Sequence, residues 1–402
     1  MTNREKIINE IQNINIAELT SDLVKIKSYS GMESQEQEVA EYIRDFLAFN
    51  GIEVSLTDAT PGRPNVIARI DGENHSIGKG PVLMLNGHID TVPAYDMERA
   101  FEGEIREGRV FGRGSCDMKG PVAAMMAAMV AIKRSGIQLA GQLVFAGVAD
   151  EEIAGIGTKA LLKDWCRADA VIVGEPTSLK IGLGNKGLEW IKVDFFGRKV
   201  HGGSQDKGVN AINMAAKFIN FITDEYVPKL AERKVEYLGS ASLNIGTING
   251  GDQPSTVADR CVVTFDRRSV PGESVEDVYR EINDIINTLS QRYPGLKAKV
   301  RDCLEGNNDL PHEGFCTPPE SHIVRAVQKA ARAQDMEPPQ LVGLSCWTDA
   351  GFIANNTDAE CIIFGPGDMA VAHTADEYIS IEQLQQAAIM YAMTALEYCG
   401  EV

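Results

Sequence analysis

Histidine and carboxylate residues stand at points in this chain where they could bind a metal ion. His88 and Asp90 lie two residues apart in "MLNGHIDTVP", directly after an apolar run. In a β-strand, residues i and i+2 share a face, so both side chains would point the same way. The pair could be a buried histidine with a hydrogen-bonding neighbour, or a metal ligand with the carboxylate that orients it.

Further acidic and histidine residues follow other segments that are typical of strands, or precede a helix. They are Asp117 in "GRGSCDMKG", Glu151 and Glu152 after "QLVFAGVAD", Glu175 in "GEPT" and His373 in "AVAHTADE". Each acid by itself has a structural explanation, such as a helix cap or a solvated turn. Open α/β sheets, however, place their sites at the carboxyl ends of strands. Five segments that bring such residues to one sheet edge indicate a metal centre.

The residue types indicate which metals would bind. Two histidines and three carboxylates, without a thiolate, suit Zn²⁺, Mn²⁺ or Co²⁺. The set is too large for one catalytic ion, which normally takes three protein ligands. It fits two ions roughly 3.5 to 4 Å apart that share one carboxylate. We therefore expect two divalent metal ions, Zn²⁺ in the first place and Co²⁺ or Mn²⁺ as alternatives.

The segments that must position these residues alternate between strands and helices. The expected strands at 81–86, 141–149 and 169–174 are almost continuously apolar, as strands covered on both faces are. Helices are expected over 35–51 and 120–136, each ending at a glycine. This alternation predicts an α/β fold with a mostly parallel sheet flanked by helices.

The pattern changes from about residue 187, where alternating strands and two amphipathic helices follow each other. The α/β pattern returns after about residue 302. We therefore predict a catalytic metal-binding domain made of residues 1–186 and 302–402. Residues 187–301 would form an inserted α+β domain that acts as a lid or a dimerisation surface.

Composition excludes several classes of partner. The net charge of -18 over 402 residues argues against nucleic acid and against anionic membranes. No signal-peptide pattern begins the chain, and no apolar run approaches the roughly 18 residues of a membrane span. Eight cysteines without C-x-x-C spacing suit reduced thiols. We expect a cytoplasmic protein that acts on a small molecule or peptide, with no membrane partner.

Six motifs make the chain resemble the M20 metallopeptidase family, which includes acetylornithine deacetylase and succinyl-diaminopimelate desuccinylase. They occur in the family's order: "NGHIDTVP", "GRGSCDMKG", "ADEEIAGIGTKALL", "VIVGEPT", "VHGGSQDKGVNAI" and "FGPGDMAVAHTADEYI". The resemblance implies a fold of the di-zinc exopeptidase type. It also implies that Asp117 bridges two ions, with His88 and Glu175 on one ion and Glu152 and His373 on the other.

The resemblance assigns roles to residues beside the ligands. Two cations would lower the pKa of a bridging water and polarise the scissile carbonyl. Glu151 would be the general base that takes the proton of this water and delivers it to the departing amine. Asp90 would accept a hydrogen bond from the His88 ring. The peptide bond after Asp117 would be cis.

The inserted domain would also contribute to the reaction. His201 would reach the active site of a partner subunit and stabilise the oxyanion, so that a homodimer through residues 187–301 is part of the mechanism. This chain has Gln205 where relatives often carry proline. Arg268 would hold the substrate's carboxylate, unless it pairs with a surface acid instead. Trp347 would line the substrate pocket.

The implied reaction is hydrolysis of the amide bond of a small N-acyl amino acid. A di- or tripeptidase or a carboxypeptidase would use the same dinuclear site, and the sequence leaves this alternative open. "GLGNKG" (182–187) has the spacing of a dinucleotide fingerprint, but a strand pattern follows it where that motif needs a helix. A non-catalytic relative would usually lose ligands or the base, and this chain keeps all six.

Overall fold

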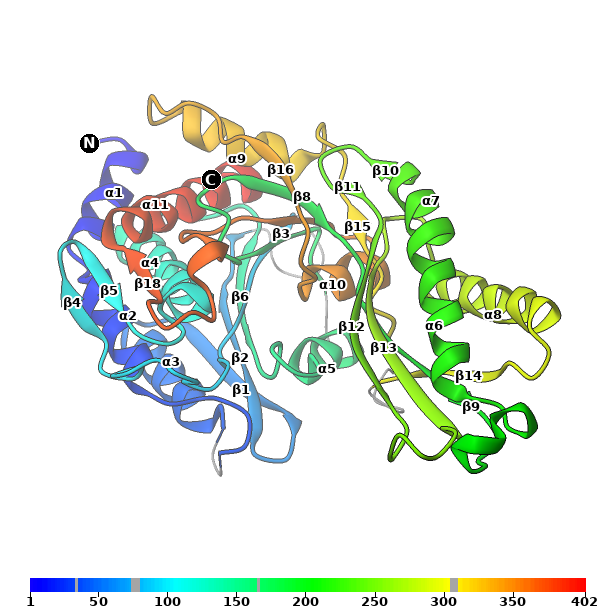
Figure 1. Ribbon diagram of the computed structural model, residues 1–402. Helices are drawn as coiled ribbons and strands as arrows, with labels where there is room; N and C mark the ends of the chain where they lie inside the picture. Colours follow the sequence, from blue (N-terminus) through cyan, green and yellow to red (C-terminus); the bar gives the residue numbers. More distant parts are fainter. Residues whose placement is uncertain (33–34, 74–79, 165–166, 304–309) are drawn as a thin grey trace. The chain divides into compact units, whose positions relative to one another are not determined.

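The chain folds into two compact units in a computed structural model (Figure 1) that describes residues 1–32, 35–73, 80–164, 167–303 and 310–402. Unit 1 consists of Met1–Gly184, Thr317–Val342 and Thr348–Val402. Unit 2 consists of Asn185–Cys316 and Gly343–Trp347. The seven cysteines in the described residues are free thiols, and Cys166 lies outside them.

Unit 1 is built on a mixed sheet with a parallel centre. Its strand order is β1 (Glu53–Thr60), β2 (Arg63–Ile70), β6 (Gln142–Val148), β3 (Val82–His88), β7 (Ala170–Val173), β17 (Glu360–Ile363) and β8 (Ile181–Asn185). Strand β3 is parallel to β6 and β7, and β17 is parallel to β7. Antiparallel pairs flank this centre, because β2 pairs with β6 and β8 with β17. The predicted mostly parallel sheet is confirmed.

Helices cover this sheet. Helices α4 (Gly120–Ser135) and α11 (Ile381–Cys399) pack against each other and against β3. Around them lie α1 (Asn3–Gln12), α2 (Ile16–Lys25) and α9 (His322–Arg332), while α3 (Gln37–Phe49) packs against β1 and β2. Helices α5 (Ile156–Asp164) and α10 (Ala350–Asn356) contact each other as well as the sheet. The observed layers are therefore those that the alternation of apolar strands and helices in the sequence predicts.

One segment differs from the expectation that no apolar stretch reaches membrane length. Ser115–Ser135 is long and apolar enough to cross a bilayer by length and composition. All of its most apolar window is buried inside the protein, as in the central helix of a globular domain. Gly87 on β3 shows how closely α4 packs, because a Cβ there would lie 3.1 Å from Val122 Cγ2.

A small sheet in unit 1 was not predicted. It has the order β18 (Tyr378–Ser380), β5 (Arg109–Phe111) and β4 (Glu104–Arg106). Both of its pairs are antiparallel. Its strands have only three residues each, which is too short for an alternation pattern to stand out in the sequence.

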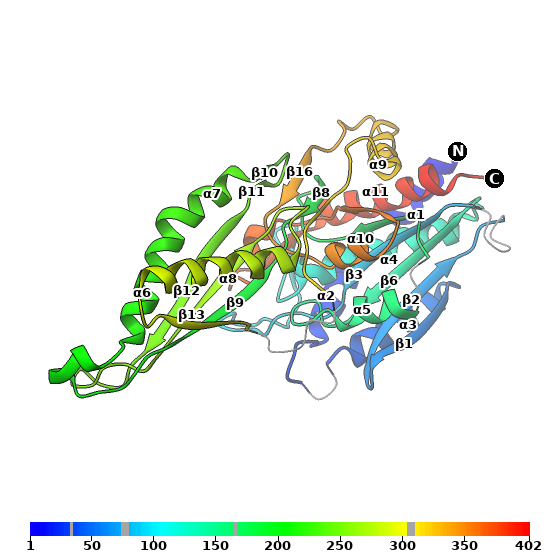
Figure 2. The ribbon, with the colours of Figure 1, turned by 90° about the vertical axis from the view of Figure 1, so that its right-hand side faces the viewer.

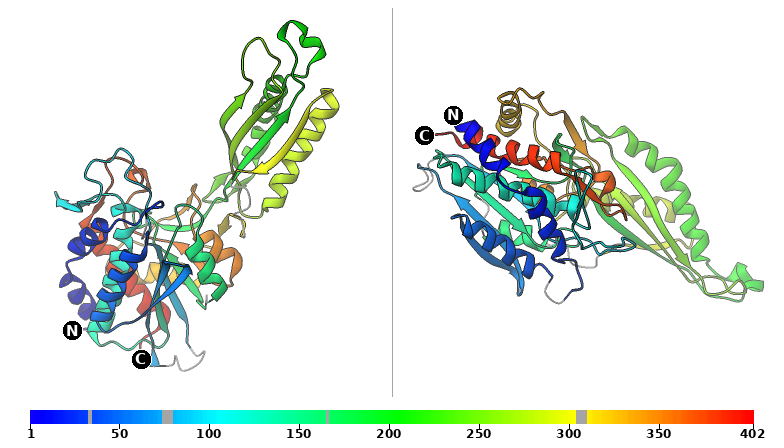
Figure 3. Two further views of the ribbon diagram at one scale, coloured as in Figure 1. Left: turned by 90° about the horizontal axis from the view of Figure 1, so that it is seen from below. Right: turned by 90° about the vertical axis from the view of Figure 1, so that its left-hand side faces the viewer.

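Unit 2 is an α+β unit around a four-stranded antiparallel sheet. The strand order is β12 (Ser242–Gly250), β13 (Arg260–Arg268), β9 (Glu189–Phe196) and β14 (Lys297–Asp302). Helices α6 (Ala211–Phe221) and α8 (Val275–Arg292) run along the sheet and contact each other (Figures 2 and 3). Strand β9 alternates, so its residues Ile191, Val193 and Phe195 face the helices in a common core.

Shorter elements complete unit 2. They are the 3₁₀ turn Gly202–Lys207, the wide turn Ile222–Tyr226, α7 (Val227–Glu232), β10 (Lys234–Val235), β11 (Gly239–Ser240) and β15 (Phe315–Cys316). Strand β16 (Leu341–Leu344) begins in unit 1 and ends in unit 2, because the boundary between the units falls after Val342.

The unit boundaries differ from the predicted domain boundaries. We predicted that the chain leaves the insert at residue 302, but residues up to Cys316 belong to unit 2. Unit 1 resumes at Thr317, whose N–H donates to the Leu183 oxygen and whose hydroxyl donates to the Cys361 oxygen. Gly343 also belongs to unit 2, because a Cβ there would lie 2.7 Å from Leu238 and from Tyr237. The lid and dimerisation roles of the insert stay predictions.

Candidate metal centre

Two groups of three side chains in unit 1 could each hold a metal ion. The first group is His88, Asp117 and Glu175, and the second is Asp117, Glu152 and His373. Within each group, one ligand atom from each residue lies within 4.8 Å of the others. Because Asp117 belongs to both groups, the arrangement has the form of two adjacent sites that share one carboxylate.

Each oxygen of Asp117 faces a different histidine. His88 Nε2 lies 3.0 Å from Asp117 Oδ1 and 3.8 Å from Glu175 Oε1. His373 Nε2 lies 3.2 Å from Asp117 Oδ2 and 3.1 Å from Glu152 Oε1. The His373 side chain is 45% exposed while that of His88 is 1% exposed, so the centre opens to solvent on the His373 side.

Parallel strands bring the ligands of the first group together. His88 is the last residue of β3, and Glu175 follows the end of β7 by two residues. The register of these strands pairs Asn86 with Val173, which places His88 and Glu175 at the same level of the sheet. The strand alternation puts them on one face, so both side chains point to the same place.

Asp117 stands in an irregular segment, Ser115–Lys119, immediately before α4. Its backbone is extended, with φ -124° and ψ 97°, and the peptide bond to Met118 is cis. Gly114 begins the segment with φ 83°, and a Cβ there would lie 2.6 Å from Thr91 Cγ2. Only glycine fits this left-handed conformation and close approach without displacing its neighbours.

A buried ion pair that the sequence analysis missed holds this segment. Glu377 Oε1 accepts hydrogen bonds from the N–H groups of Cys116 and Asp117, at 3.0 and 3.1 Å. Its Oε2 accepts from Arg113 Nη1 at 2.5 Å. Arg113 also donates to the backbone oxygen of His373, at 3.4 Å. The pair therefore links the segments that carry Asp117 and His373. Its only signal in the sequence was its place inside two of the motifs.

Asp90 contacts the His88 ring and also the turn that carries two glutamates. His88 Nδ1 is 3.1 Å from the backbone oxygen of Asp90 and 3.5 Å from its carboxylate. The two carboxylate oxygens instead accept the N–H groups of Glu151 and Glu152, at 3.1 and 3.2 Å. The backbone oxygen is thus the nearer partner of the imidazole, and the carboxylate holds the turn that carries the two glutamates.

Burial makes the ionised form of the carboxyl groups in this centre unfavourable. Burial raises the pKa of the Glu175 carboxyl well above its usual range, and the neighbouring Asp117 carboxylate adds to the effect. Hydrogen bonds to Asp117 and Glu152 raise the pKa of His373 to about 10. Protons on acids and imidazoles thus offset the repulsion between carboxylates where no cation lies between them. The side chains of the two groups are suitable ligands for divalent cations, because they combine imidazole nitrogen with carboxylate oxygen and include no lysine or arginine.

Glu151 stands next to this centre without being one of its ligands. Its carboxylate makes no hydrogen bond to any part of the chain that the structure describes, while its N–H is held by Asp90. Burial raises the pKa of the Glu151 carboxyl well above its usual range, although charge on His88 opposes the shift. A carboxylate that is held by its backbone and has free oxygens is suited to exchange a proton with water or substrate.

Three residues that we expected to contribute lie in unit 2, whereas the metal centre lies in unit 1. His201 is exposed, and its Nδ1 accepts the N–H of Gly203 at 3.1 Å. Arg268 donates to both oxygens of Asp266, at 2.7 and 2.9 Å, so its guanidinium is paired with an acid on its own strand. The Trp347 ring meets the His312 ring edge-on, with centroids 4.6 Å apart.

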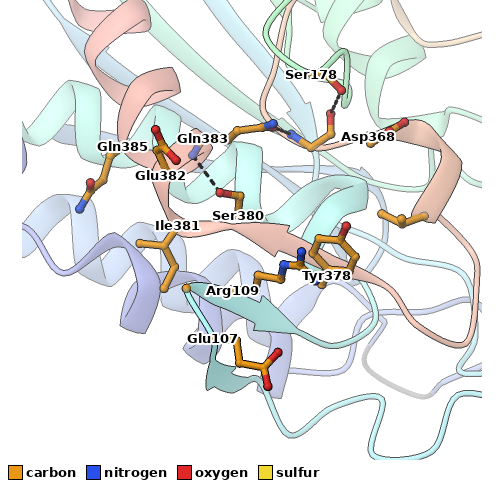
Figure 4. A pocket seen from close by; sticks show the side chains of 13 residues that line it. Glu107, Arg109, Ser178, Asp368, Tyr378, Ser380, Ile381, Glu382, Gln383 and Gln385 are labelled. Atoms are coloured by element: carbon orange, nitrogen blue, oxygen red, sulfur yellow. Dashed lines mark hydrogen bonds between the residues drawn. The ribbon is translucent and has the colours of Figure 1, made fainter.

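A cavity of about 690 Å³ opens elsewhere on unit 1 (Figure 4). One wall is Gly367, Asp368 and Val371, in the segment that leads to His373. The Arg109 guanidinium lies over the Tyr378 ring on another wall, 4.2 Å from its centroid. None of the residues expected from the sequence to form the site is among those that line this cavity.

Comparison with known proteins agrees with the motifs. The sequence pattern of peptidase family M20/M25/M40 matches residues 84–397. The acetylornithine deacetylase of Myxococcus xanthus is 30% identical, over 86% of this chain and 87% of the relative. A probable succinyl-diaminopimelate desuccinylase of Staphylococcus epidermidis is 27% identical, over 90% of this chain and 92% of the relative.

A third curated relative acts on a different amide. It is the N-formyl-4-amino-5-aminomethyl-2-methylpyrimidine deformylase of Halalkalibacterium halodurans, 27% identical over 95% of this chain and 93% of the relative. Among solved structures, aminopeptidase PepT of Bacillus cereus superposes with a TM-score of 0.77 at 22% identity, covering 98% of both chains. A dinuclear metal-binding peptidase of Bacillus subtilis gives 0.71 at 16% identity, also over 98% of both. These two structures share the fold with this chain.

We predict that Glu377→Gln weakens metal binding by about 10- to 100-fold, as loss of a group that orients ligands usually does. The change removes the charge that pairs with Arg113 and weakens the acceptor of the Cys116 and Asp117 N–H groups, so the Asp117 segment is held less firmly. Titration of the metal-free protein with Zn²⁺ or Co²⁺ in a calorimeter measures the effect. Glu382→Gln, at an exposed position on α11, is the matched control. Equal affinities in both variants would show that the ion pair does not position the ligands.

Proposed function

The chain belongs to peptidase family M20/M25/M40, and from this premise we propose that it hydrolyses the amide bond of a small N-acyl amino acid. The observation that supports the proposal is the pair of ligand groups that share Asp117, with the free carboxylate of Glu151 beside them. Relatives that cleave acyl groups from amines match most of this chain, among them a deacetylase and a deformylase. The acyl group and the amino acid are not specified by these relatives.

We infer that two divalent cations, Zn²⁺ or alternatively Co²⁺ or Mn²⁺, belong to this centre. His88 and Glu175 would hold one of them, Glu152 and His373 the other, and Asp117 both. When bound, such a pair activates a water molecule and polarises the carbonyl that it attacks. Imidazole and carboxylate ligands suit all three of these metals, so the identity of the bound metal has to be measured.

Glu151 is the general base of the proposed reaction. Its carboxylate accepts a proton from the attacking water and later donates this proton to the nitrogen of the departing amine. Asp90 supports this step because it fixes the N–H of Glu151 and leaves the carboxylate free to move a proton. The proton therefore passes from water to leaving group through one side chain.

We also propose that unit 2 takes part through a homodimer. His201 would donate a hydrogen bond to the oxyanion in the partner's site, as the family motif around it implies. Its ring is exposed, and Nε2 makes no hydrogen bond in the described part of the chain, so this nitrogen is available as a donor. Arg268 and Trp347 are weaker candidates for substrate contacts, since Arg268 would first have to leave Asp266.

Exhaustive chelation should abolish hydrolysis, and added Zn²⁺, Co²⁺ or Mn²⁺ should restore it. The assay needs a panel of N-acetyl-ornithine, N-succinyl-diaminopimelate, N-acetyl-methionine and several dipeptides. Cleavage of an N-acyl amino acid supports the proposal, and cleavage of dipeptides alone would assign the alternative, a di- or tripeptidase. Activity that survives chelation unchanged would contradict the metal centre.

Glu151→Gln should lower kcat by about 10² to 10⁴-fold, the usual contribution of a general acid–base group. Metal content, measured by atomic emission, should stay as in the unchanged protein because Glu151 is outside both ligand groups. Glu98→Gln, an exposed position, serves as the control. Near-normal turnover of Glu151→Gln would remove this residue from the base role.

Mixing two inactive variants tests the shared site. A His201→Ala subunit and a Glu151→Gln subunit should together form heterodimers that recover part of the activity, because one of the two sites then has both intact residues. Each variant alone, measured at the same total protein concentration, provides the baseline. Heterodimers that form but recover no activity would show that His201 does not act across subunits.

A further inference from the structure

The turn that carries Glu151 has no regular structure of its own. It joins the end of β6 at Val148 to the start of α5 at Ile156. Backbone hydrogen bonds inside the turn hold part of it, because the N–H groups of Ala154 and Gly155 donate to the Asp150 oxygen at 3.1 and 2.6 Å. Side chains from other segments hold its two ends and its middle. Asn65 holds both ends, because its Oδ1 accepts the N–H of Ala149 at 3.1 Å and its Nδ2 donates to the Gly157 oxygen at 2.8 Å.

A further contact holds the first turn of α5. The Thr158 hydroxyl donates to Asp349 Oδ2 at 2.6 Å, across 191 residues of sequence. Both residues are buried, with exposed fractions of 0% for Thr158 and 1% for Asp349. The other carboxylate oxygen, Asp349 Oδ1, is buried and has no hydrogen-bond partner among the described residues.

Stability of the fold does not explain this aspartate. Asp349 precedes α10 at the position where an aspartate usually caps a helix, but its side chain makes no capping hydrogen bond. A buried carboxylate with a single partner costs free energy, because the desolvated oxygens lose their water. A residue that is unfavourable for folding and does not cap its helix is a candidate for a functional role.

The same turn approaches Asp349 at a second point. Gly155, four residues after Glu151, has φ 62°, and a Cβ there would lie 3.2 Å from Asp349 Oδ1. It would also lie 2.7 Å from Phe352 Cε2, on the first turn of α10. The turn and the start of α10 are therefore in direct contact on both sides of the Asp349 carboxylate.

We propose that Asp349 and Thr158 are positioning residues that fix the turn carrying Glu151 against the start of α10. The proposal rests on the proposed function, because it assigns the contact a role in the work of Glu151. Asp90 holds the Glu151 N–H from one side, and Asp349 holds the beginning of α5 from the other. The Glu151 carboxylate, which has no hydrogen bond of its own, thereby keeps a constant distance from the ligand groups.

Three variants test the proposal. Thr158→Val removes the hydroxyl at nearly constant volume, and Thr158→Ser keeps it. Thr20→Val is the matched control, since Thr20 is also 0% exposed and its hydroxyl donates to the Ile16 oxygen at 2.8 Å within α2. Two measurements apply to all of them: hydrogen exchange of residues 149–158 in metal-free protein, and kcat and KM of the metal-loaded enzyme on the substrate that it cleaves.

Thr158→Val should speed exchange in this turn and lower kcat, each by about tenfold, the effect of one lost buried hydrogen bond. KM should stay within about twofold, and kcat is compared at saturating metal because the ligand Glu152 lies in the same turn. Thr158→Ser should behave as the unchanged protein, and Thr20→Val should leave both the turn and kcat unaffected. Normal exchange or normal kcat in Thr158→Val would overturn the proposal, as would an equal loss in Thr20→Val.

The two proposals fail in different ways. If the unchanged protein cleaves none of the amides offered, the proposed function fails, and hydrogen exchange still decides whether Asp349 and Thr158 hold the turn. If the protein is an active hydrolase and Thr158→Val matches it in both measurements, the positioning role alone is wrong.

Discussion

Carboxylates that lie close together and out of water repel one another unless positive charge stands between them. Unit 1 places Asp117, Glu152 and Glu175 with two histidines in such a group. Burial raises the pKa of Glu175, so protons or cations must neutralise the group. The surrounding elements hold these groups together despite the repulsion between their charges. Parallel strands deliver ligands to one edge, and the segment before α4 brings Asp117 to the middle, where each of its oxygens meets a different imidazole.

Side chains from distant segments keep these ligands in place. Glu377 and Arg113 fix the backbone of Asp117 and reach the segment of His373, while Asp90 fixes the turn of Glu151 and Glu152. Each of these contacts is a hydrogen bond between a charged side chain and a backbone group of an irregular segment: Glu377 and Asp90 accept from N–H groups, and Arg113 donates to a carbonyl oxygen. Because irregular segments lack the hydrogen bonds of helices and sheets, such contacts decide where the ligand side chains point. Asp349 and Thr158 also join distant segments, but through a hydrogen bond between two side chains.

Much of this arrangement could be predicted from the sequence. Apolar runs predicted the buried strands β3, β6 and β7, and glycines predicted the ends of α3 and α4. The motifs indicated which residues gather at the sheet edge. Other details escaped prediction, among them the small sheet of β4, β5 and β18 and the boundary at Cys316. The N–H partners of the Asp90 carboxylate escaped it as well, because short strands and single hydrogen bonds leave no periodic pattern.

By itself, the sequence determined the fold class, the long buried strands and helices, and the candidate metal ligands. Local periodicity and residue chemistry suffice for these, since both can be read along the chain. Only the tertiary structure decided which polar atom meets which partner. Glu377 binds the backbone of Asp117 across 260 residues, and Asp349 binds Thr158 across 191. Contacts of this range depend on the path of the whole chain, and a difference of one ångström decides whether a hydrogen bond forms.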